Sequence, residues 1–475
     1  MIFSSIEYIL FFPIVFFLYW FVFNKSLRVQ NFLIFVSSYV FYGWWDWRFL
    51  SLLLLTSTVD YVMGIKIEDE ENDTKKKRLV AVSWTLNLII FGYFKYFGFF
   101  VNSFVDAFQT IGYSVNRPTL NIILPIGISF YTLQSLSYTI DIYRKQLKPT
   151  RNFVDFLAFV SFFPQLLAGP IERATNLLPQ FYKARVFDFE LAKDGMRQMM
   201  WGLFKKVVIA DNCAPFVNDI FINYSGLSGS TLYFGYILFS IQLYCDFGGY
   251  SDIAVGSGKL FGFKLMRNFQ NPFFALNPPD FWRRWHISLS SWFRDYLYVP
   301  MGGSKKGKLH LMFALVVTFT ISGLWHGANW NFVLWGFING CFIAIFFLVL
   351  GKNRKIKFGD KHNIPSLREF RMMLVNYNLI ALTLVFFRSP DITSSFSYYN
   401  RMFTHILGPL QWGKISFIAV GIAFMIFEWR NRHKLHALEN LRYGTFGRWL
   451  IYFVLTCFIV VEMGKPAQEF IYFQF

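Results

Sequence analysis

Long blocks without charged residues alternate with short polar loops along most of the chain. Neither 8–23 nor 30–45 contains a single charged residue. Apolar blocks of about 18 residues or more cross a hydrocarbon core of about 30 Å as helices. The pattern predicts spans at 8–23, 30–45, 49–65, 79–101, 119–140, 152–169, 231–247, 311–328, 331–350, 372–388, 413–429 and 449–464. We therefore expect an all-α, polytopic membrane protein of about 11–13 transmembrane helices, folded as one domain over 1–475.

Two stretches depart from this pattern. Residues 196–222 are amphipathic enough to form either a span or a surface helix. Residues 248–300 are polar and rich in Gly and Pro. Non-helical backbone at membrane depth is tolerated only where protein buries it or where it lines water. We expect 248–300 to form short or re-entrant helices inside a shell of spans, and we look for chemistry there.

The charge of the loops predicts the topology. The most basic loops lie at 144–151, 305–308, 352–357 and 430–434, and they should face the cytoplasm. Loops 102–118 and 390–412 carry few Lys or Arg residues and should face outward, together with the N-terminus.

Composition supports the membrane interpretation. The 475-residue chain is 55% hydrophobic and only 16% charged, whereas soluble proteins carry about 25% charged residues. The net charge of +18 falls mostly in short loops, where it indicates topology and contacts with anionic lipid rather than nucleic-acid binding. The four Cys residues show no CxxC or metal-ligand spacing, so we expect neither a disulfide framework nor a metal site.

Two of the seven histidines are candidates for catalysis. His326 stands at the junction of two predicted spans, between Gly323 and Gly327, and His286 stands in the Gly- and Pro-rich stretch. A buried neutral imidazole can take a proton from a hydroxyl near physiological pH. The alternative is a structural histidine that is hydrogen-bonded to a neighbour, and the spacing leaves both interpretations open.

Charged residues accompany both the central stretch and the span before it. Arg283 and Arg284 place cations beside His286, and Arg283 could bind a phosphate of a cofactor or a lipid, or could set topology by snorkelling. Asp246 and Asp252 lie at or just beyond the end of a predicted span, where they could orient a histidine or cap a helix. Capping is favoured for Asp252.

Three classes of function fit such a chain: an enzyme, a transporter and a structural scaffold of a secretion complex. A transporter predicts charged residues spread over several spans and repeat symmetry. In a scaffold, both histidines would be dispensable. The chain instead concentrates its polar residues in one region and shows no evident repeat, which favours an enzyme.

The segments around the two histidines resemble the membrane-bound O-acyltransferase family, and within it the bacterial branch that modifies polysaccharides. The similar segments are 130–138 (FYTLQSLSY), 162–171 (FFPQLLAGPI), 244–247 (YCDF), 280–286 (DFWRRWH), 294–303 (RDYLYVPMGG), 324–330 (LWHGANW) and 472–475 (YFQF). The likeness is densest over 121–341, which implies a catalytic core there. It also implies a ring of tilted helices around a thin centre crossed by a tunnel.

The resemblance assigns roles to individual residues. His326 matches the histidine taken as catalytic across the family, and His286 matches the partner position, where many eukaryotic relatives carry Asn. Further substrate or donor contacts are implied for Arg283, Arg284, Trp285, Trp325, Asn329, Asp246 and Gln134.

The implied reaction is acyl transfer from a cytoplasmic thioester to a hydroxyl, without a tightly bound cofactor or metal. The donor would be acetyl-CoA or, as in D-alanine transfer to teichoic acids, a carrier-protein thioester. The acceptor would be an extracytoplasmic glycan such as an alginate-like polysaccharide, or a secreted acetyltransferase partner. The resemblance places the enzyme in the inner (cytoplasmic) membrane. Direct transfer is preferred over an acyl-enzyme, because no Ser or Cys stands in a nucleophile motif.

Overall fold

The structure is a computed structural model, and it describes residues 1–113, 122–351, 364–408, 415–465 and 468–473. All regular structure in these residues is helical, which confirms the predicted fold class. Among them, six helices are long and apolar enough to cross a membrane: Phe49–Asp69, Asp73–Thr110, Lys308–His326, Trp330–Leu350, Leu367–Arg388 and Thr445–Met463. The chain is therefore a multi-pass membrane protein, while the total of 11–13 spans stays a prediction.

The chain separates into two compact units, Met1–Gly195 with Ala254–Met266, and Met196–Ile253 with Arg267–Phe475. Whether they act as the single predicted domain stays a prediction, as does the tunnel. The elements between Met1 and Leu203 are α1 (Ile6–Phe17), η1 (Leu18–Val22), α2 (Leu27–Gly43), α3 (Phe49–Asp69), α4 (Asp73–Thr110), α5 (Ile128–Tyr143), α6 (Phe153–Ser161), α7 (Phe163–Leu166), α8 (Ala174–Leu177), η2 (Leu178–Tyr182) and α9 (Phe189–Leu203).

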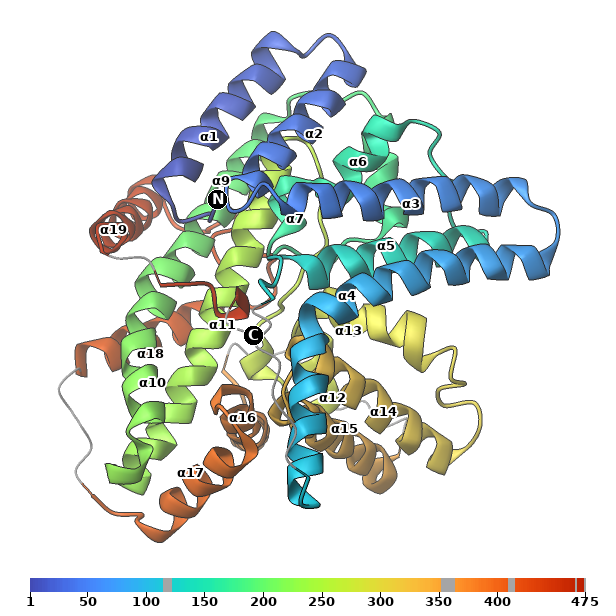
Figure 1. Ribbon diagram of the computed structural model, residues 1–475. Coiled ribbons are helices and arrows are strands. Elements are labelled where there is room, and N and C mark those ends of the chain that lie inside the picture. The colour runs from blue at the N-terminus through green and yellow to red at the C-terminus, as the bar shows by residue number, and fades with distance from the viewer. Residues whose placement is uncertain (114–121, 352–363, 409–414, 466–467, 474–475) are drawn as a thin grey trace. The chain divides into compact units, whose positions relative to one another are not determined.

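The first unit is built around helices α3, α4 and α5, which pack against one another (Figure 1). Helix α4 starts where Asn72 caps it, with the Asn72 side chain accepting from the Lys75 N–H, and it continues for 38 residues. The predicted span 79–101 therefore lies inside a much longer helix.

The predicted span 152–169 is wrong. Helix α6 begins after Asn152, which caps it, and ends at Ser161 after nine residues. Phe162 has a non-helical ψ of 106°, and Pro164 follows within the four-residue helix α7. At 1.5 Å per residue, α6 is about 14 Å long, too short for a hydrocarbon core of about 30 Å. Its apolar residues are buried inside the first unit, and burial in protein cannot be told from burial in lipid by hydrophobicity alone.

A buried carboxyl group lies within the spans of the first unit. Asp60 of α3 is completely buried and accepts hydrogen bonds from Ser83 Oγ at 2.6 Å and Asn87 Nδ2 at 3.0 Å, both on α4. Charged groups at membrane depth are costly, and both of these donors are neutral. The site therefore holds a hydrogen-bond acceptor, and its geometry does not require a full charge.

Replacing Asp60 by leucine is expected to destabilise the protein by about 1–3 kcal/mol, because Ser83 and Asn87 lose a buried acceptor. Asp60→Asn keeps an acceptor oxygen and removes the need to bury a charge, so its thermal midpoint in detergent should match or exceed that of the wild type. An Asn variant as unstable as the Leu variant would show that the ionised carboxylate is needed.

The second unit holds the remaining elements. They are η3 (Phe204–Ala210), α10 (Asp211–Ile222), η4 (Tyr224–Gly226), α11 (Gly229–Leu260), η5 (Pro272–Phe274), α12 (Pro278–Arg284), α13 (Ile287–Phe293), η6 (Arg294–Tyr298), α14 (Lys308–His326), α15 (Trp330–Leu350), α16 (Leu367–Arg388), α17 (Ile392–Thr404), α18 (Ile415–Arg430), α19 (Thr445–Met463) and η7 (Ile471–Phe473).

The ambiguous stretch 196–222 is helical throughout. Helix α9 passes into the π-helical segment η3 and then into α10 without a break. All seven residues of η3 are buried, including Lys205 and Lys206, which a helix lying on the membrane surface would expose. The segment η3 therefore lies in the interior of the protein and not on the membrane surface.

The expectation of short helices throughout 248–300 is only partly correct. Helix α11 does not stop near 247 but continues to Leu260 through four glycines. The glycines allow close packing: a Cβ on Gly249 would lie 2.7 Å from the Gly202 carbonyl oxygen of α9, too close for any side chain. Beyond α11, the chain does form the expected short helices η5, α12 and α13.

Helices α14 and α15 form a tightly packed hairpin in the second unit (Figure 1). A Cβ on Gly323 of α14 would lie 2.1 Å from the Phe332 carbonyl oxygen, and one on Gly336 of α15 would lie 2.2 Å from the Phe319 carbonyl oxygen. Small residues let membrane helices approach closely in this way. The hairpin thereby fixes the end of α14, where His326 stands.

Gly323→Ala should force α14 away from α15, costing about 1–3 kcal/mol of stability and displacing His326 three residues later. We expect a lower thermal midpoint together with reduced activity. Gly92→Ala on α4 is the control, because a Cβ there meets no atom within 4 Å. Equal thermal midpoints for the two variants would contradict the close packing.

Candidate active site

His326 is the last residue of α14, and its side chain is 4% exposed. The helix ends there because Gly327 adopts an extended conformation, with φ −161°. Asn329 then caps α15, its side chain accepting from the Asn331 N–H at 3.0 Å. The histidine is thus held between a helix end and a helix start, and it faces the interior of the second unit.

His286 lies at the sharp turn between α12 and α13, and it is 1% exposed. Its backbone is left-handed, with φ 43° and ψ 55°. The turn is held from the side by 268–270: Ile287 N donates to Asn268 O at 2.9 Å, and Gln270 N donates to Arg284 O at 2.9 Å. Strained backbone of this kind is concentrated at functional sites.

The structure brings the two predicted histidines together. Their ring centroids lie 6.3 Å apart, although 40 residues separate them in the sequence. Trp325 lies beside both rings, at 6.1 Å from His286 and 5.0 Å from His326. Trp335 and Phe387 lie 5.3 and 5.4 Å from His326. Two buried imidazoles in an aromatic enclosure can exchange protons with a substrate while water is excluded.

His326 lines a small cavity of about 20 Å³. Its walls are largely aromatic and aliphatic: Ser240, Leu243, Phe273, Phe281, Trp282, Trp285, Trp335, Tyr377, Ile380, Ala381, Leu384, Phe387 and Tyr472. Ligand pockets usually measure about 300–1,000 Å³. The space beside His326 is therefore much smaller than an ordinary ligand pocket.

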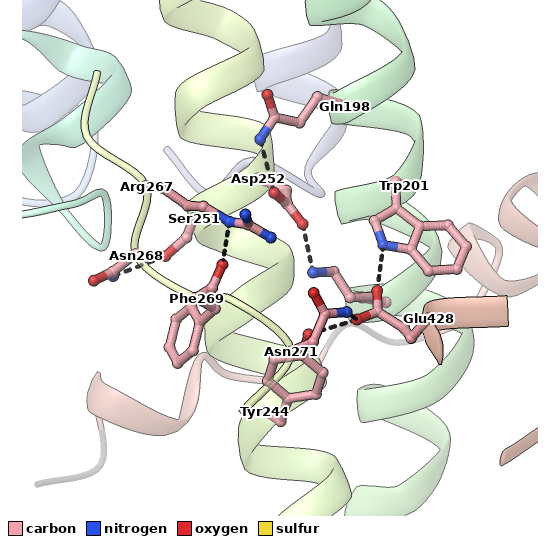
Figure 2. A network of polar contacts seen from close by, with 11 residues as sticks. Gln198, Trp201, Tyr244, Ser251, Asp252, Arg267, Asn268, Phe269, Asn271 and Glu428 are labelled. Carbon is pink, nitrogen blue, oxygen red and sulfur yellow. Dashed lines mark hydrogen bonds and ion pairs between the residues drawn. The ribbon is translucent and has the colours of Figure 1, made fainter. Parts of the chain in front are cut away.

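A buried polar network supports the site from one side, and Figure 2 shows its members. Glu428 of α18 accepts from Trp201 Nε1 at 3.0 Å, from Tyr244 OH at 2.8 Å and from Asn271 Nδ2. Asn268 Nδ2 donates to Ser251 Oγ of α11 at 3.0 Å. The segment that holds His286 is therefore itself fixed to α11 and α18.

Asp252 belongs to the same network and is not a helix cap. It lies inside α11, where it accepts from Gln198 Nε2 at 2.8 Å and forms an ion pair with the buried Lys205 (Figure 2 shows its contact with Gln198). The prediction of capping was wrong because α11 extends beyond the apolar stretch that the sequence marks.

Residues 468–473, called the C-terminal segment below, form part of the histidine site. Lys206 Nζ contacts Asp211 at 2.7 Å, Asp246 at 2.8 Å and the Gln468 carbonyl oxygen at 3.1 Å. Asp246 also accepts from Ile471 N at 2.8 Å. These contacts place the Tyr472 ring 5.6 Å from His326 and 6.5 Å from His286.

The other predicted site residues lie in different places, and only some of them are at the histidine site. Trp285 and Trp325 lie at the histidine site, since Trp285 lines the cavity. Asp246 contacts Lys206 and Ile471, so it fixes the C-terminal segment. Arg283 is exposed and donates to Pro279 O, and Arg284 pairs with Asp280 at 3.1 Å. Asn329 acts as a cap, as described above.

Gln134 belongs to the first unit, where its Nε2 donates to Phe159 O at 3.1 Å and its Oε1 accepts from Gln165 Nε2 at 3.3 Å. Substrate contacts for these residues stay predictions.

Sequence reasoning missed several neighbours of the histidines, among them Trp335, Phe387, Asn268 and Tyr472. Tyr472 lay in a segment already singled out by resemblance, so that signal was available. The sequence gave no such signal for Asn268, because a lone Asn in a Gly- and Pro-rich loop is ordinarily a turn residue.

Comparison with known proteins identifies the family of the chain. The model of the membrane-bound O-acyltransferase family matches residues 143–389, which include both histidines. A probable alginate O-acetylase of Azotobacter vinelandii is 37% identical over 85% of this chain and 78% of its own length. The Pseudomonas aeruginosa counterpart is 35% identical over 90% of this chain and 80% of its own length. A peptidoglycan O-acetyltransferase of Helicobacter pylori is 34% identical over 77% of this chain and 72% of its own length.

The match covers more than half of the chain, and the relatives align over most of their length. The chain thus belongs to the membrane-bound O-acyltransferase family, and it is a multi-pass O-acyltransferase.

Proposed function

We propose that this enzyme transfers acetyl groups from a cytoplasmic thioester to hydroxyl groups of an extracytoplasmic glycan, either directly or through a secreted acetyltransferase partner. The observation that carries the proposal is the pair of buried histidines 6.3 Å apart in a largely apolar enclosure. The names of the relatives, O-acetylases of alginate and of peptidoglycan, support acetyl as the group and a glycan as the acceptor. The inner membrane, where acetyl-CoA can reach the cytoplasmic face, is the proposed location.

The mechanism follows from the two imidazoles. His326 takes the proton of the acceptor hydroxyl as its oxygen attacks the carbonyl carbon of the thioester. The C–O bond forms, the C–S bond breaks, and the thiolate leaves with the proton that the His326 imidazolium returns. His286 orients the acceptor or stabilises the charge on the reacting carbonyl oxygen. Direct transfer needs no nucleophilic side chain.

The lining of the cavity favours acetyl over D-alanyl transfer. A D-alanyl group carries an ammonium ion, and a buried cation requires an anionic partner or a comparable group. Among the described residues that line the cavity with His326, there is no carboxylate. An acetyl group, small and uncharged, suits such walls.

The experiment supplies radiolabelled acetyl-CoA to membranes that contain the enzyme and then analyses the surface glycans by mass spectrometry. We expect O-acetyl esters that depend on the enzyme and disappear on mild alkaline treatment. Label that enters only when an acyl-loaded carrier protein is supplied would instead favour the carrier thioester. Glycans that show the same acetylation with and without the enzyme would contradict the proposal.

A further inference from the structure

The side chain of Asn268 contacts the Nδ1 atom of the His286 ring. Its Oδ1 lies 3.0 Å from His286 Nδ1, and both residues are buried, at 2% and 1% exposure. A neutral imidazole carries one proton, on either nitrogen, and the hydrogen bond made by one nitrogen decides the state of the other. The orientation of the Asn268 amide therefore bears directly on the chemistry of His286.

Two neighbours fix that orientation. The Ser288 backbone N–H lies 3.4 Å from Asn268 Oδ1, and a backbone N–H can only donate, so the oxygen and not the NH₂ group must face it. Ser288 Oγ donates to the same oxygen at 3.0 Å. On the opposite side, Asn268 Nδ2 donates to Ser251 Oγ at 3.0 Å. Flipping the amide would set its NH₂ group against the Ser288 N–H.

We infer that Asn268 is a positioning residue that holds the proton of His286 on Nδ1 and leaves the lone pair on Nε2. The Oδ1 atom is an acceptor, so the Nδ1 atom opposite it must donate. An imidazole in water favours the other tautomer, with its proton on Nε2. Buried Ser251, Ser288 and Asn268 together thus select the less common form.

This assignment decides between the two roles left open for His286, and in that respect it rests on the proposed function. A neutral His286 with a lone pair on Nε2 can accept a hydrogen bond from a hydroxyl of the acceptor. It cannot donate to the negatively charged oxygen that forms at the carbonyl, because that would require a proton on Nε2. His286 therefore orients the acceptor, and His326 removes the proton.

The decisive measurement is independent of activity. Solid-state ¹⁵N NMR of the histidine-labelled protein in lipid, at a pH above the ordinary histidine pKa, distinguishes a protonated ring nitrogen from a bare one. The His286 signals are those missing from His286→Gln. We expect the wild type to carry its proton on Nδ1. A wild-type proton on Nε2 would overturn the inference, whatever the activity.

Variants of Asn268 extend the test. Asn268→Asp keeps an acceptor at the same place and should retain the Nδ1–H form, whereas Asn268→Ala should shift His286 toward Nε2–H. Asn376→Ala is the matched control: its amide is also buried, but it donates to the backbone oxygen of Ala275 at 3.1 Å instead of contacting a histidine. An unchanged Nδ1–H population in Asn268→Ala would also contradict the inference.

Acetyl transfer provides a second readout. Partners that orient a metal-bound histidine through its other nitrogen change activity by about 10–100-fold. By the same physical reasoning, Asn268→Ala should lower kcat by a similar factor, while Asn268→Asp stays within a few-fold of the wild type. If the NMR result held but the wild type transferred no acetyl group, the proposed function would fail and the tautomer assignment would stand.

Discussion

Replacing His326 by alanine is expected to lower acyl transfer by about 10²–10⁴-fold, the usual contribution of a general base. The side chain lies buried at the end of α14, 6.3 Å from His286 between ring centroids, so bulk water cannot easily take its place. The measurement is the initial rate of acetyl incorporation at matched protein levels in membranes.

His310→Ala is the matched control, since His310 stands in the first turn of the same helix, where its Nε2 contacts Met301 O at 2.7 Å. It should retain nearly the full rate. If His326→Ala remained active at normal abundance, the mechanism proposed above would be wrong. If both variants lost activity together, the cause would lie in the folding of α14 and not in base catalysis.

The largest expected effect on stability comes from Lys206→Met. Lys206 is 1% exposed and neutralises two carboxylates, Asp211 and Asp246, which would be left buried without a cation. Removing one partner of a buried ion pair costs about 3–5 kcal/mol. We expect a large drop in the thermal midpoint in detergent.

The same variant should also release the C-terminal segment, because Lys206 holds Gln468 O and Asp246 holds Ile471 N. Lys77→Met is the control: Lys77 pairs with Asp73 at 2.8 Å, but both side chains are more than half exposed. Its midpoint should stay unchanged, since exposed pairs contribute little. Equal midpoints for Lys206→Met and the wild type would show that the buried cation is dispensable.

The helices of the spans could be predicted from the sequence because an uninterrupted apolar run has a single favourable conformation in lipid. Helices α14 and α15 match the predicted spans 311–328 and 331–350 to within three residues. The run at 152–169 is also largely apolar, but its helix is interrupted at Phe162 and its residues are buried in protein. Likewise, the end of α11 could not be predicted from the sequence, because its glycines allow close helix packing and do not end the helix.

The pairing of His286 with His326 was anticipated from the chemistry of buried imidazoles and from resemblance, and the structure places the two rings side by side. Trp285 and Trp325 were anticipated beside them, but other neighbours were not. Asn268, Glu428 and Tyr472 come from distant parts of the chain, and only the fold brings Asn268 and Tyr472 to the histidines. Arg283, a candidate by proximity in sequence, is exposed on α12, and its contact with a donor stays a prediction. Neighbours along a helix often face opposite ways.

The left-handed backbone at residue 286 limits what evolution can place there. With φ at 43°, β-branched residues are strongly disfavoured, while His, Asp and above all Asn are tolerated. Asn, which the family resemblance implies at this position in many eukaryotic relatives, would therefore be compatible with the same turn but would lack the imidazole. Exchange between the two residues would leave the architecture intact and alter only the proton chemistry, so a lineage could retune this position without refolding the protein around it.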